Sequence, residues 1–175
     1  MIFLIGLELL LLVILVFAAI NFWNIVFRGF APFVKANQEV IDIIIDNIKP
    51  TKGQVIYELG AGTANFLRGL EAKYPEAKLI GIENSFYPYL LAKAKLRKLQ
   101  SRIDLRRENL YKTDLHGASF IYCYLIPTMM PKLSEKNQKE CRPGTIVISY
   151  IFSIPNLPIH KTIETKGGNI YFYEV

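Results

Sequence analysis

Acidic residues and glycines stand at the ends of two predicted strands, where they could bind a ligand. The sequence VIYELGAGTA of residues 55–64 runs from an apolar strand through Glu58 into Gly60 and Gly62. Glycines at such a turn let a ligand approach the backbone, and a carboxylate beside them can hold a cationic group. Glu83 ends the next apolar run 21 residues after Gly62 (83 − 62), where a carboxylate can accept hydrogen bonds from ribose hydroxyls. We therefore predict a ligand site at this edge. Asn65 stands where dinucleotide-binding turns carry their third glycine, so that motif is absent.

These residues need a sheet that brings the ends of successive strands to one edge. Apolar runs predict strands over residues 54–59, 78–82, 103–107, 119–125 and 145–150. Helices are predicted over residues 38–48, from the glycine turn to about residue 74, and over residues 88–100 and 129–140. Two final strands, 161–165 and 169–175, are joined by KGG and predict a hairpin. Strands that alternate with helices predict an α/β fold with a parallel sheet and right-handed crossovers.

The composition sets limits on the class of protein. Of the 175 residues, 51% are hydrophobic and 21% are charged, which excludes a disordered or collagen-like chain. The two cysteines, Cys123 and Cys141, are too few for a disulfide scaffold, and they lack metal-ligand spacing, so no metal site is expected. The net charge of +6 indicates an anionic partner, either nucleic acid or a lipid surface.

The apolar excess is concentrated near the start of the sequence. From Ile2 to Ile20 only Gly6 and Glu8 fall outside the apolar set, and a helix of this length spans about 28 Å, close to the hydrocarbon core of a bilayer. A cleaved signal peptide is the alternative, but no basic residue precedes the run and no cleavage site is well placed after it. We therefore predict a retained transmembrane helix within residues 1–27, a linker at 28–37 and an α/β domain at 38–175.

Charge predicts the orientation of this anchor. No Lys or Arg precedes the apolar run, whereas Arg28 and Lys35 follow it, so the domain is expected on the cytoplasmic face of the cell membrane. A second group of basic residues extends from Lys93 to Arg107. It is expected to be a solvated helix face or to lie against an anionic lipid surface. Nucleic-acid binding is not expected, because no recognised module is present.

The glycine turn resembles motif I of the class I S-adenosylmethionine-dependent methyltransferases, in which an acidic residue is followed by glycines at alternate positions; Ala64 replaces the last glycine. The resemblance implies S-adenosyl-L-methionine as cofactor. It also implies a Rossmann-like sheet of seven strands in the order 3-2-1-4-5-7-6, with strand 7 antiparallel.

The same resemblance implies roles for individual residues. Gly60 and Gly62, with Ala61 between them, would pass beneath the methionine and ribose of the cofactor. Glu58 would lie near the methionine ammonium, and Glu83 would bind the ribose. Three further contacts are implied for residues outside these two strand ends: Asn109 and Leu110 at the adenine, and Phe33 as a cover over the cofactor.

The acceptor is indicated by the end of the fourth predicted strand. Its sequence YCYLIP lacks the Asp/Asn-Pro-Pro-Tyr/Phe motif of enzymes that methylate nucleic-acid amines. The segments APFV, ENLYKTDL, YLIP and RPGTIVIS instead resemble the membrane-anchored protein-lysine methyltransferases typified by the ATP synthase c-subunit lysine N-methyltransferase. A lysine of a membrane or membrane-associated protein is then the expected acceptor, with Tyr124 as the candidate catalytic residue that orients the amine.

Two alternatives remain open from the sequence. The acceptor could be a lipid or a hydrophobic small molecule, although a hydroxyl acceptor would favour a general base and none is identified. The chain could also bind the cofactor without catalysis, as an assembly factor in the membrane. His116 and His160 are expected in loops away from the strand ends, so neither is assigned a role.

Overall fold

The computed structural model describes residues 2–28 and 36–175, and within the first range it describes the side chains of residues 5–20. The chain divides into two compact units, Met1–Val34 and Lys35–Val175. Phe33, which was predicted to cover the cofactor, lies outside the described residues.

The first unit contains helix α1, which spans Ile2–Arg28 and includes the apolar segment in which a membrane span was predicted. Its large apolar side chains are exposed: Leu9, Leu12 and Leu15 are 59%, 57% and 59% exposed. Within the described residues, no helix reaches the length and apolar character that crossing a membrane requires.

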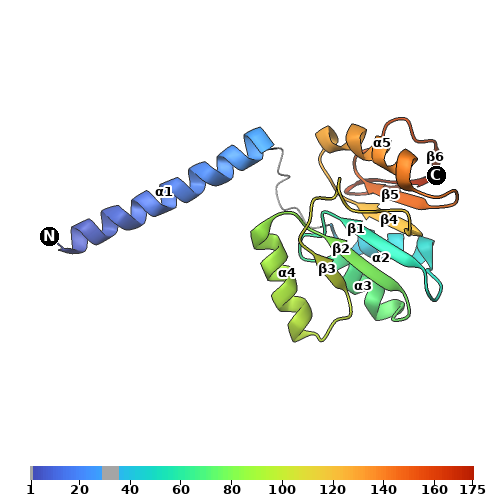
Figure 1. Cartoon of the computed structure of the whole chain (residues 1–175), viewed down its shortest axis with the longest axis horizontal. Coiled ribbons are helices and arrows are strands. Elements are labelled where there is room, and N and C mark those ends of the chain that lie inside the picture. Colours follow the sequence, from blue (N-terminus) through green and yellow to red (C-terminus); the bar gives the residue numbers. More distant parts are fainter. Residues whose placement is uncertain (1, 29–35) are drawn as a thin grey trace. The chain divides into compact units, whose positions relative to one another are not determined.

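The second unit is built on one sheet of seven strands in the order β3-β2-β1-β4-β5-β7-β6 (Figure 1). The strands are β1 (Val55–Leu59), β2 (Lys78–Ile82), β3 (Asp104–Arg106), β4 (Phe120–Cys123), β5 (Ile146–Tyr150), β6 (Ile159–Thr165) and β7 (Gly168–Glu174). Strands β1 to β5 are parallel, whereas β7 is antiparallel to both β5 and β6. The strand order and the reversed seventh strand confirm the predicted fold.

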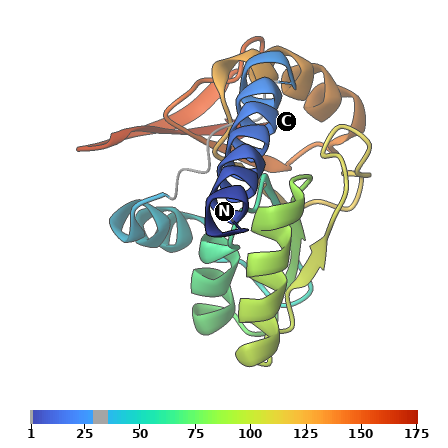
Figure 2. The same ribbon diagram turned by 90° about the vertical axis from the view of Figure 1, so that its left-hand side faces the viewer.

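Four helices accompany this sheet. They are α2 (Gln38–Ile48), α3 (Asn65–Lys73), α4 (Phe86–Lys98) and α5 (Met130–Glu140), and a short 3-10 helix, η1 (Pro127–Met129), precedes α5. Figure 2 shows α4 (green) beside α3 (teal) and the β6–β7 hairpin extending from the edge of the sheet. Helix α2 begins at the residue predicted, and Asn37 caps it by accepting a hydrogen bond from the backbone N–H of Glu39.

Side chains of the central strands point alternately to two faces of the sheet. Ile56 and Tyr122 belong to the core on the face covered by α2 and α3. Leu59 and Ile121 belong to the opposite core, to which α5 contributes Leu133. Both faces of the central parallel strands are thus buried, as their nearly continuous apolar sequences require. Functional side chains are therefore confined to the strand ends.

Four predicted boundaries are wrong by about two residues: both ends of α4, the end of β4 and the start of β6. Two of them have a clear physical reason. Helix α4 begins at Phe86 rather than Pro88, because proline is tolerated in the first turn of a helix and does not have to start it. Strand β4 ends at Cys123 rather than Leu125, because its neighbour β1 leaves the sheet at Gly60 and offers no further pairing. Tyr124 consequently lies just beyond the strand.

Candidate functional site

The glycine turn after β1 is fixed by the end of β2. The backbone N–H groups of Gly60 and Ala61 both donate to the carbonyl oxygen of Ile82, each at 2.9 Å. Gly60 has a φ of 79°, and a Cβ on it would lie 2.7 Å from the Leu125 side chain. Glycine is required there because the conformation is left-handed and the approach is close. The turn can therefore present its backbone to a ligand.

Ala64 closes this turn in the conformation that a glycine would adopt. Its φ is 54° and its ψ is 38°, and its side chain is fully buried. The N–H of Ala64 donates to the carbonyl oxygen of Ala61 at 2.7 Å, and α3 begins at the next residue. Replacement of the motif's last glycine by alanine thus leaves the left-handed turn in place.

Glu83 follows β2 and ties the two strand ends together. Its Oε2 accepts a hydrogen bond of 2.8 Å from the N–H of Gly62, and its Oε1 accepts one of 2.7 Å from the N–H of Ser85. The side chain is buried, with 8% of its surface exposed. Each carboxylate oxygen retains a lone pair, so Glu83 can accept further hydrogen bonds from ligand hydroxyls.

Glu58, in β1, is a buried acid with an unused oxygen. Only 7% of the residue is exposed, and its Oε2 has no hydrogen-bond partner among the described residues. Burial raises the pKa of this carboxyl well above its usual range, a hydrogen bond from the Leu67 backbone opposes the rise, and the charge of Glu83 adds to it. A buried carboxylate oxygen without a partner is costly, whereas a cationic ligand beside it would favour the ionised form.

Tyr122 is a residue that the sequence reasoning missed. It lies in β4 directly opposite Glu58 of β1, so both side chains point to the same face of the sheet. Its ring packs against Phe66, with centroids 4.3 Å apart, and its hydroxyl is buried without a hydrogen-bond partner in the described chain. Burial, and secondarily the charge of Glu58, raises the pKa of Tyr122 well above its usual range. Nothing in the apolar run FIYC distinguishes this tyrosine from a core aromatic, so only the register shows its position.

The segment after β3 carries the predicted adenine contacts. Asn109 is exposed, and its Oδ1 accepts a hydrogen bond of 2.9 Å from the N–H of Tyr111, so its Nδ2 remains the group that can face a ligand. Leu110 is buried in the core on the α5 face. The neighbouring Glu108 has a buried Oε1 without a partner in the part of the chain that is described, and the sequence analysis assigned it no role.

The ends of β4 and β5 bring two tyrosines together. Tyr124 and Tyr150 pack edge to face, with ring centroids 4.9 Å apart. Burial raises the pKa of Tyr124, and so does the nearby Tyr150, so its hydroxyl stays protonated at neutral pH. Ser149, which precedes Tyr150 and is buried on the opposite face of the sheet, donates its hydroxyl to the carbonyl oxygen of Phe152 at 2.6 Å. Burial also raises the pKa of the Cys123 thiol to about 12, so this cysteine is not a nucleophile.

Neither histidine lies at the carboxyl ends of the strands. His116 precedes β4, and its Nδ1 lies 2.6 Å from Asp114 Oδ1. His160 is in β6 next to Ile159, which pairs with Tyr173, and Tyr173 in turn pairs with Val147 near the start of β5. Both histidines therefore lie toward the opposite edge of the sheet from Glu58, but the predicted loop position is wrong for His160, which β6 includes because this strand begins at Ile159 rather than Lys161.

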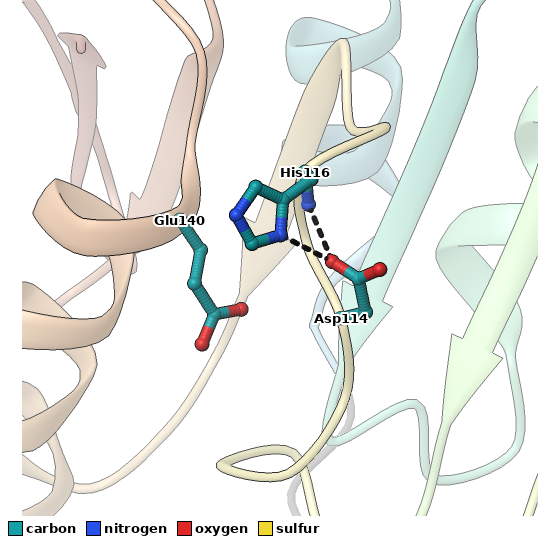
Figure 3. Close-up of side chains that lie close together, drawn as sticks. All are labelled: Asp114, His116 and Glu140. Atoms are coloured by element: carbon teal, nitrogen blue, oxygen red, sulfur yellow. Dashed lines mark hydrogen bonds and ion pairs between the residues drawn. The ribbon is translucent and has the colours of Figure 1, made fainter.

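Asp114, His116 and Glu140 form a cluster that could in principle hold a metal ion (Figure 3). The Nζ atom of Lys136 lies 2.7 and 2.6 Å from the two carboxylate oxygens of Glu140, however. The side chain of Lys136 is only 6% exposed, so its ammonium group cannot leave Glu140 for solvent without rearrangement. Because the ammonium already neutralises Glu140, we interpret the cluster as an ion-pair network.

The strand ends together can bind a nucleoside that carries a positive charge. Glu83 offers acceptors for ribose hydroxyls, the backbone of Gly60 and Gly62 allows a close approach, and Glu58 offers an unpaired buried carboxylate oxygen for a cation. Of the predicted binding residues, the structure brings these four and Ala61 together at the ends of β1 and β2, while Asn109 and Leu110 follow β3 at the same edge of the sheet.

Comparison with known proteins agrees with this architecture. A curated protein-lysine N-methyltransferase from Saccharolobus islandicus (strain REY15A) is 23% identical over 150 residues, which cover 82% of this chain and 93% of the relative. The solved structure of an RNA methyltransferase from Salinibacter ruber in complex with S-adenosyl-L-homocysteine has a TM-score of 0.76 at 22% identity and covers 81% of this chain and 94% of that one. A precorrin-6y C5,15-methyltransferase from Geobacter metallireducens GS-15 has a TM-score of 0.66 at 13% identity, over 82% and 90% of the two chains.

A family model described as the ANTKMT methyltransferase domain matches residues 58–161, more than half of the chain. The match begins at Glu58 and includes the glycine turn, Glu83 and the ends of β3, β4 and β5. The chain therefore belongs to the ANTKMT methyltransferase family and is a class I enzyme that uses S-adenosyl-L-methionine.

Proposed function

We propose that this enzyme methylates the side-chain amine of a lysine in a membrane or membrane-associated protein. The observation that carries the proposal is the match over nearly the whole length of a protein-lysine N-methyltransferase, which covers 93% of that relative. The segment YLIP after β4 and the segment YIFS, which begins at the last residue of β5, fit the same proposal because they contain apolar and hydroxyl groups and no acid or histidine.

The residues present fit the cofactor. Glu58, with its unpaired buried oxygen, would face the methionine ammonium, and Glu83 would bind the ribose hydroxyls. Asn109 Nδ2 and the carboxylate of Glu108 offer polar groups for the adenine. When bound, S-adenosyl-L-methionine supplies an electrophilic methyl group on a sulfonium ion.

The acceptor side would then have to orient an amine and keep it uncharged. A lysine ammonium, with a usual pKa of about 10.4, must lose its proton before its nitrogen can attack a methyl group. Apolar surroundings lower the pKa of an amine, and Leu125 and Ile126 provide such surroundings next to Tyr124. The protonated hydroxyl of Tyr124 would orient the neutral amine, and exclusion of water would complete the site.

We further propose that α1 attaches the enzyme to the cell membrane, with the catalytic unit on the cytoplasmic side. The support is the apolar sequence from Ile2 to Ile20 and the exposure of its leucines. Arg28 and Lys35, which follow the apolar segment, favour the cytoplasmic orientation. Attachment would confine the enzyme and a membrane-bound substrate to one surface and raise their effective concentration.

The acceptor is tested by incubating membranes with the purified full chain and S-adenosyl-L-methionine that carries a labelled methyl group. We expect label on a protein band and recovery of methyllysine from it by mass spectrometry, with loss of the label in the Glu83→Ala variant and not in Glu135→Ala. Label in the organic phase instead would contradict the lysine proposal and show a lipid or hydrophobic small-molecule acceptor.

Attachment is tested separately by alkaline carbonate extraction of membranes from cells that express the full chain. The wild type and the matched variant Leu11→Val/Ile14→Val should stay in the pellet. Leu11→Asp/Ile14→Asp should move to the supernatant, because two charges oppose burial in hydrocarbon. Release of the wild type by carbonate would contradict attachment through α1.

A further inference from the structure

The surface of α4 carries most of the exposed apolar side chains in the catalytic unit. Within residues 36–175, the exposed large apolar side chains are Phe86 (58%), Tyr87 (70%), Leu90 (43%), Leu91 (43%), Leu99 (54%) and Ile159 (53%). All but Ile159 belong to α4 or to the residue that follows it. Such a concentration on one element differs from the scattered exposed leucines of an ordinary surface and indicates a contact surface.

The exposed apolar side chains of α4 lie on a different face of the helix from its buried side chains. Ala92 and Leu96 are buried, at 0% and 5% exposure, and they face the domain. Phe86 and Leu90 are four residues apart, as are Tyr87 and Leu91, so these four side chains share the opposite face of the helix. We name this set, Phe86, Tyr87, Leu90 and Leu91, the α4 apolar face. Figure 2 shows α4 (green) on the outside of the domain.

Basic residues border the α4 apolar face. Arg97 and Lys98 lie seven residues after Leu90 and Leu91, two turns further along the same side of the helix, and both are exposed. Arg107, which follows β3, places its guanidinium 5.0 Å from the centroid of the Phe86 ring. The helix itself, from Phe86 to Lys98, contains no acidic residue. An apolar face bordered by cations is the pattern of helices that lie in the interface of an anionic bilayer.

The α4 apolar face lies near the candidate cofactor site. Helix α4 begins three residues after Glu83, so its apolar face starts at the carboxyl edge of the sheet, where the cofactor residues are gathered. Contact of that face with a bilayer would therefore bring the same edge of the sheet close to the membrane. An acceptor group that emerges from a membrane would then meet the edge that holds the methyl donor.

We propose that the α4 apolar face and its basic border form a second membrane-contact surface, which docks the catalytic unit on anionic phospholipid. The proposal rests on the proposed attachment of the chain to membranes but concerns a different element. Helix α1 would keep the protein at the membrane, and α4 would set the orientation of the active site. A second copy of the chain or a partner protein could also cover an apolar face, but the basic border and the absence of acids on α4 favour lipid headgroups.

The test uses the full chain in vesicles whose acyl chains carry bromine, which quenches tryptophan that enters the bilayer. The chain has one tryptophan, Trp23, so a Trp23→Phe background allows a probe at Tyr87→Trp and a control probe at Glu135→Trp, on the exposed side of α5. In vesicles that contain phosphatidylglycerol, the probe at 87 should be quenched and the control should not. Flotation of the same samples reports attachment independently of quenching.

Two further variants separate the apolar from the electrostatic contribution. Leu90→Ser/Leu91→Ser, at exposed positions, should abolish quenching at 87 without unfolding the domain. Arg97→Gln/Lys98→Gln should lower the docking equilibrium constant by about 30-fold in phosphatidylglycerol vesicles, or about fivefold per basic residue. The same change should have little effect in pure phosphatidylcholine.

The outcomes separate the two proposals. A chain that fails to float with vesicles contradicts attachment through α1, and with it the premise of docking. A chain that floats but shows equal signals at 87 and 135 overturns docking through α4 and leaves attachment intact. A probe at 87 whose emission depends on the ratio of protein to lipid, without quenching by bromine, would show that a second copy covers the α4 apolar face and would also overturn the proposal.

Discussion

The proposed cofactor half and the proposed acceptor half of the active site are built on different principles. At the ends of β1 and β2, the backbone of Gly60 and Ala61 is bonded to Ile82, and Gly62 is bonded to Glu83, so polar groups are fixed by specific hydrogen bonds. At the ends of β4 and β5, the side chains are held by aromatic packing between Tyr124 and Tyr150. The first half can recognise one particular ligand, whereas the second offers shape and low polarity.

This difference explains why the cofactor is easier to identify than the acceptor. Fixed backbone groups and carboxylates define the hydrogen-bonding pattern of their ligand. Aromatic and apolar side chains accept any group of suitable size, and their selectivity depends on what approaches the surface. The predictions that follow change one half at a time and measure cofactor affinity, stability and turnover separately.

The largest effect is expected from Gly60→Val. A β-branched residue at a φ of 79° is strained, and its Cβ would meet Leu125 at 2.7 Å. We expect cofactor affinity to fall by at least about 100-fold, roughly 2.7 kcal/mol, by calorimetry. Gly117→Val is the control, because a Cβ on Gly117 has open space around it. Equal affinities of the two variants would show that the turn does not contact the cofactor.

Glu83→Ala should weaken cofactor binding by about 1–3 kcal/mol, the cost of removing a charged hydrogen-bonding partner. The change also frees the N–H groups of Gly62 and Ser85, so the turn should loosen. Calorimetry measures the affinity, and Glu135→Ala on α5 serves as the control for loss of an exposed carboxylate. Undiminished affinity would contradict the ribose role.

Glu58→Gln should have opposite effects on stability and on binding, each about 1–2 kcal/mol. Because the pKa of Glu58 is raised in the folded chain, the unfolded chain loses this proton first, and wild-type stability without cofactor should fall as pH rises above about 4.5. Glutamine removes that loss, so the variant should be more stable at neutral pH, by urea unfolding.

The same variant should bind the cofactor more weakly, because the cationic group loses its carboxylate. Wild-type affinity should rise with pH as Glu58 ionises, and the affinity of Glu58→Gln should not follow that rise. Glu39→Gln, at an exposed position of α2, is the control. A parallel pH dependence in the wild type and Glu58→Gln would rule out Glu58 as its source.

The smallest effect is expected in the acceptor half. Tyr124→Phe keeps the packing against Tyr150 and removes only the hydroxyl, so kcat should fall by about tenfold while cofactor affinity stays unchanged. Tyr74→Phe, at the end of α3, is the matched control. If kcat is unaffected, Tyr124 is a packing residue and the acceptor amine is oriented by another group.

The sequence signals for the proposed cofactor half are local. Each apolar run ends in a residue type that stands out from it, either an acid or a glycine. Glu58, Gly60 and Glu83 can therefore be singled out as candidates without a structure. Tyr122 could not be identified, because its proximity to Glu58 depends on the pairing of β4 with β1. Glu108 was missed for a similar reason, since its burial depends on the packing after β3.

The exposed apolar face of α4 could not be predicted from the sequence. From the sequence, a helix was predicted over residues 88–100 and the basic residues from Lys93 to Arg107 were assigned to a solvated face or a lipid surface, but no exposed apolar face was identified. In the structure, the buried residues of α4 are Ala92 and Leu96, and the α4 apolar face is exposed. Burial of a helix face depends on tertiary contacts, which periodicity alone does not determine.

The hydrogen-bonded turn after β1 also has a consequence for the way in which the cofactor binds. Ala64 is held in a left-handed conformation, and the N–H groups from Gly60 to Gly62 are bonded to the chain itself. A loop that is preorganised in this way loses little conformational entropy when a ligand arrives. The cofactor should then bind without rearrangement of this loop. Amide hydrogen exchange in the loop should therefore change little when the protein is saturated with cofactor.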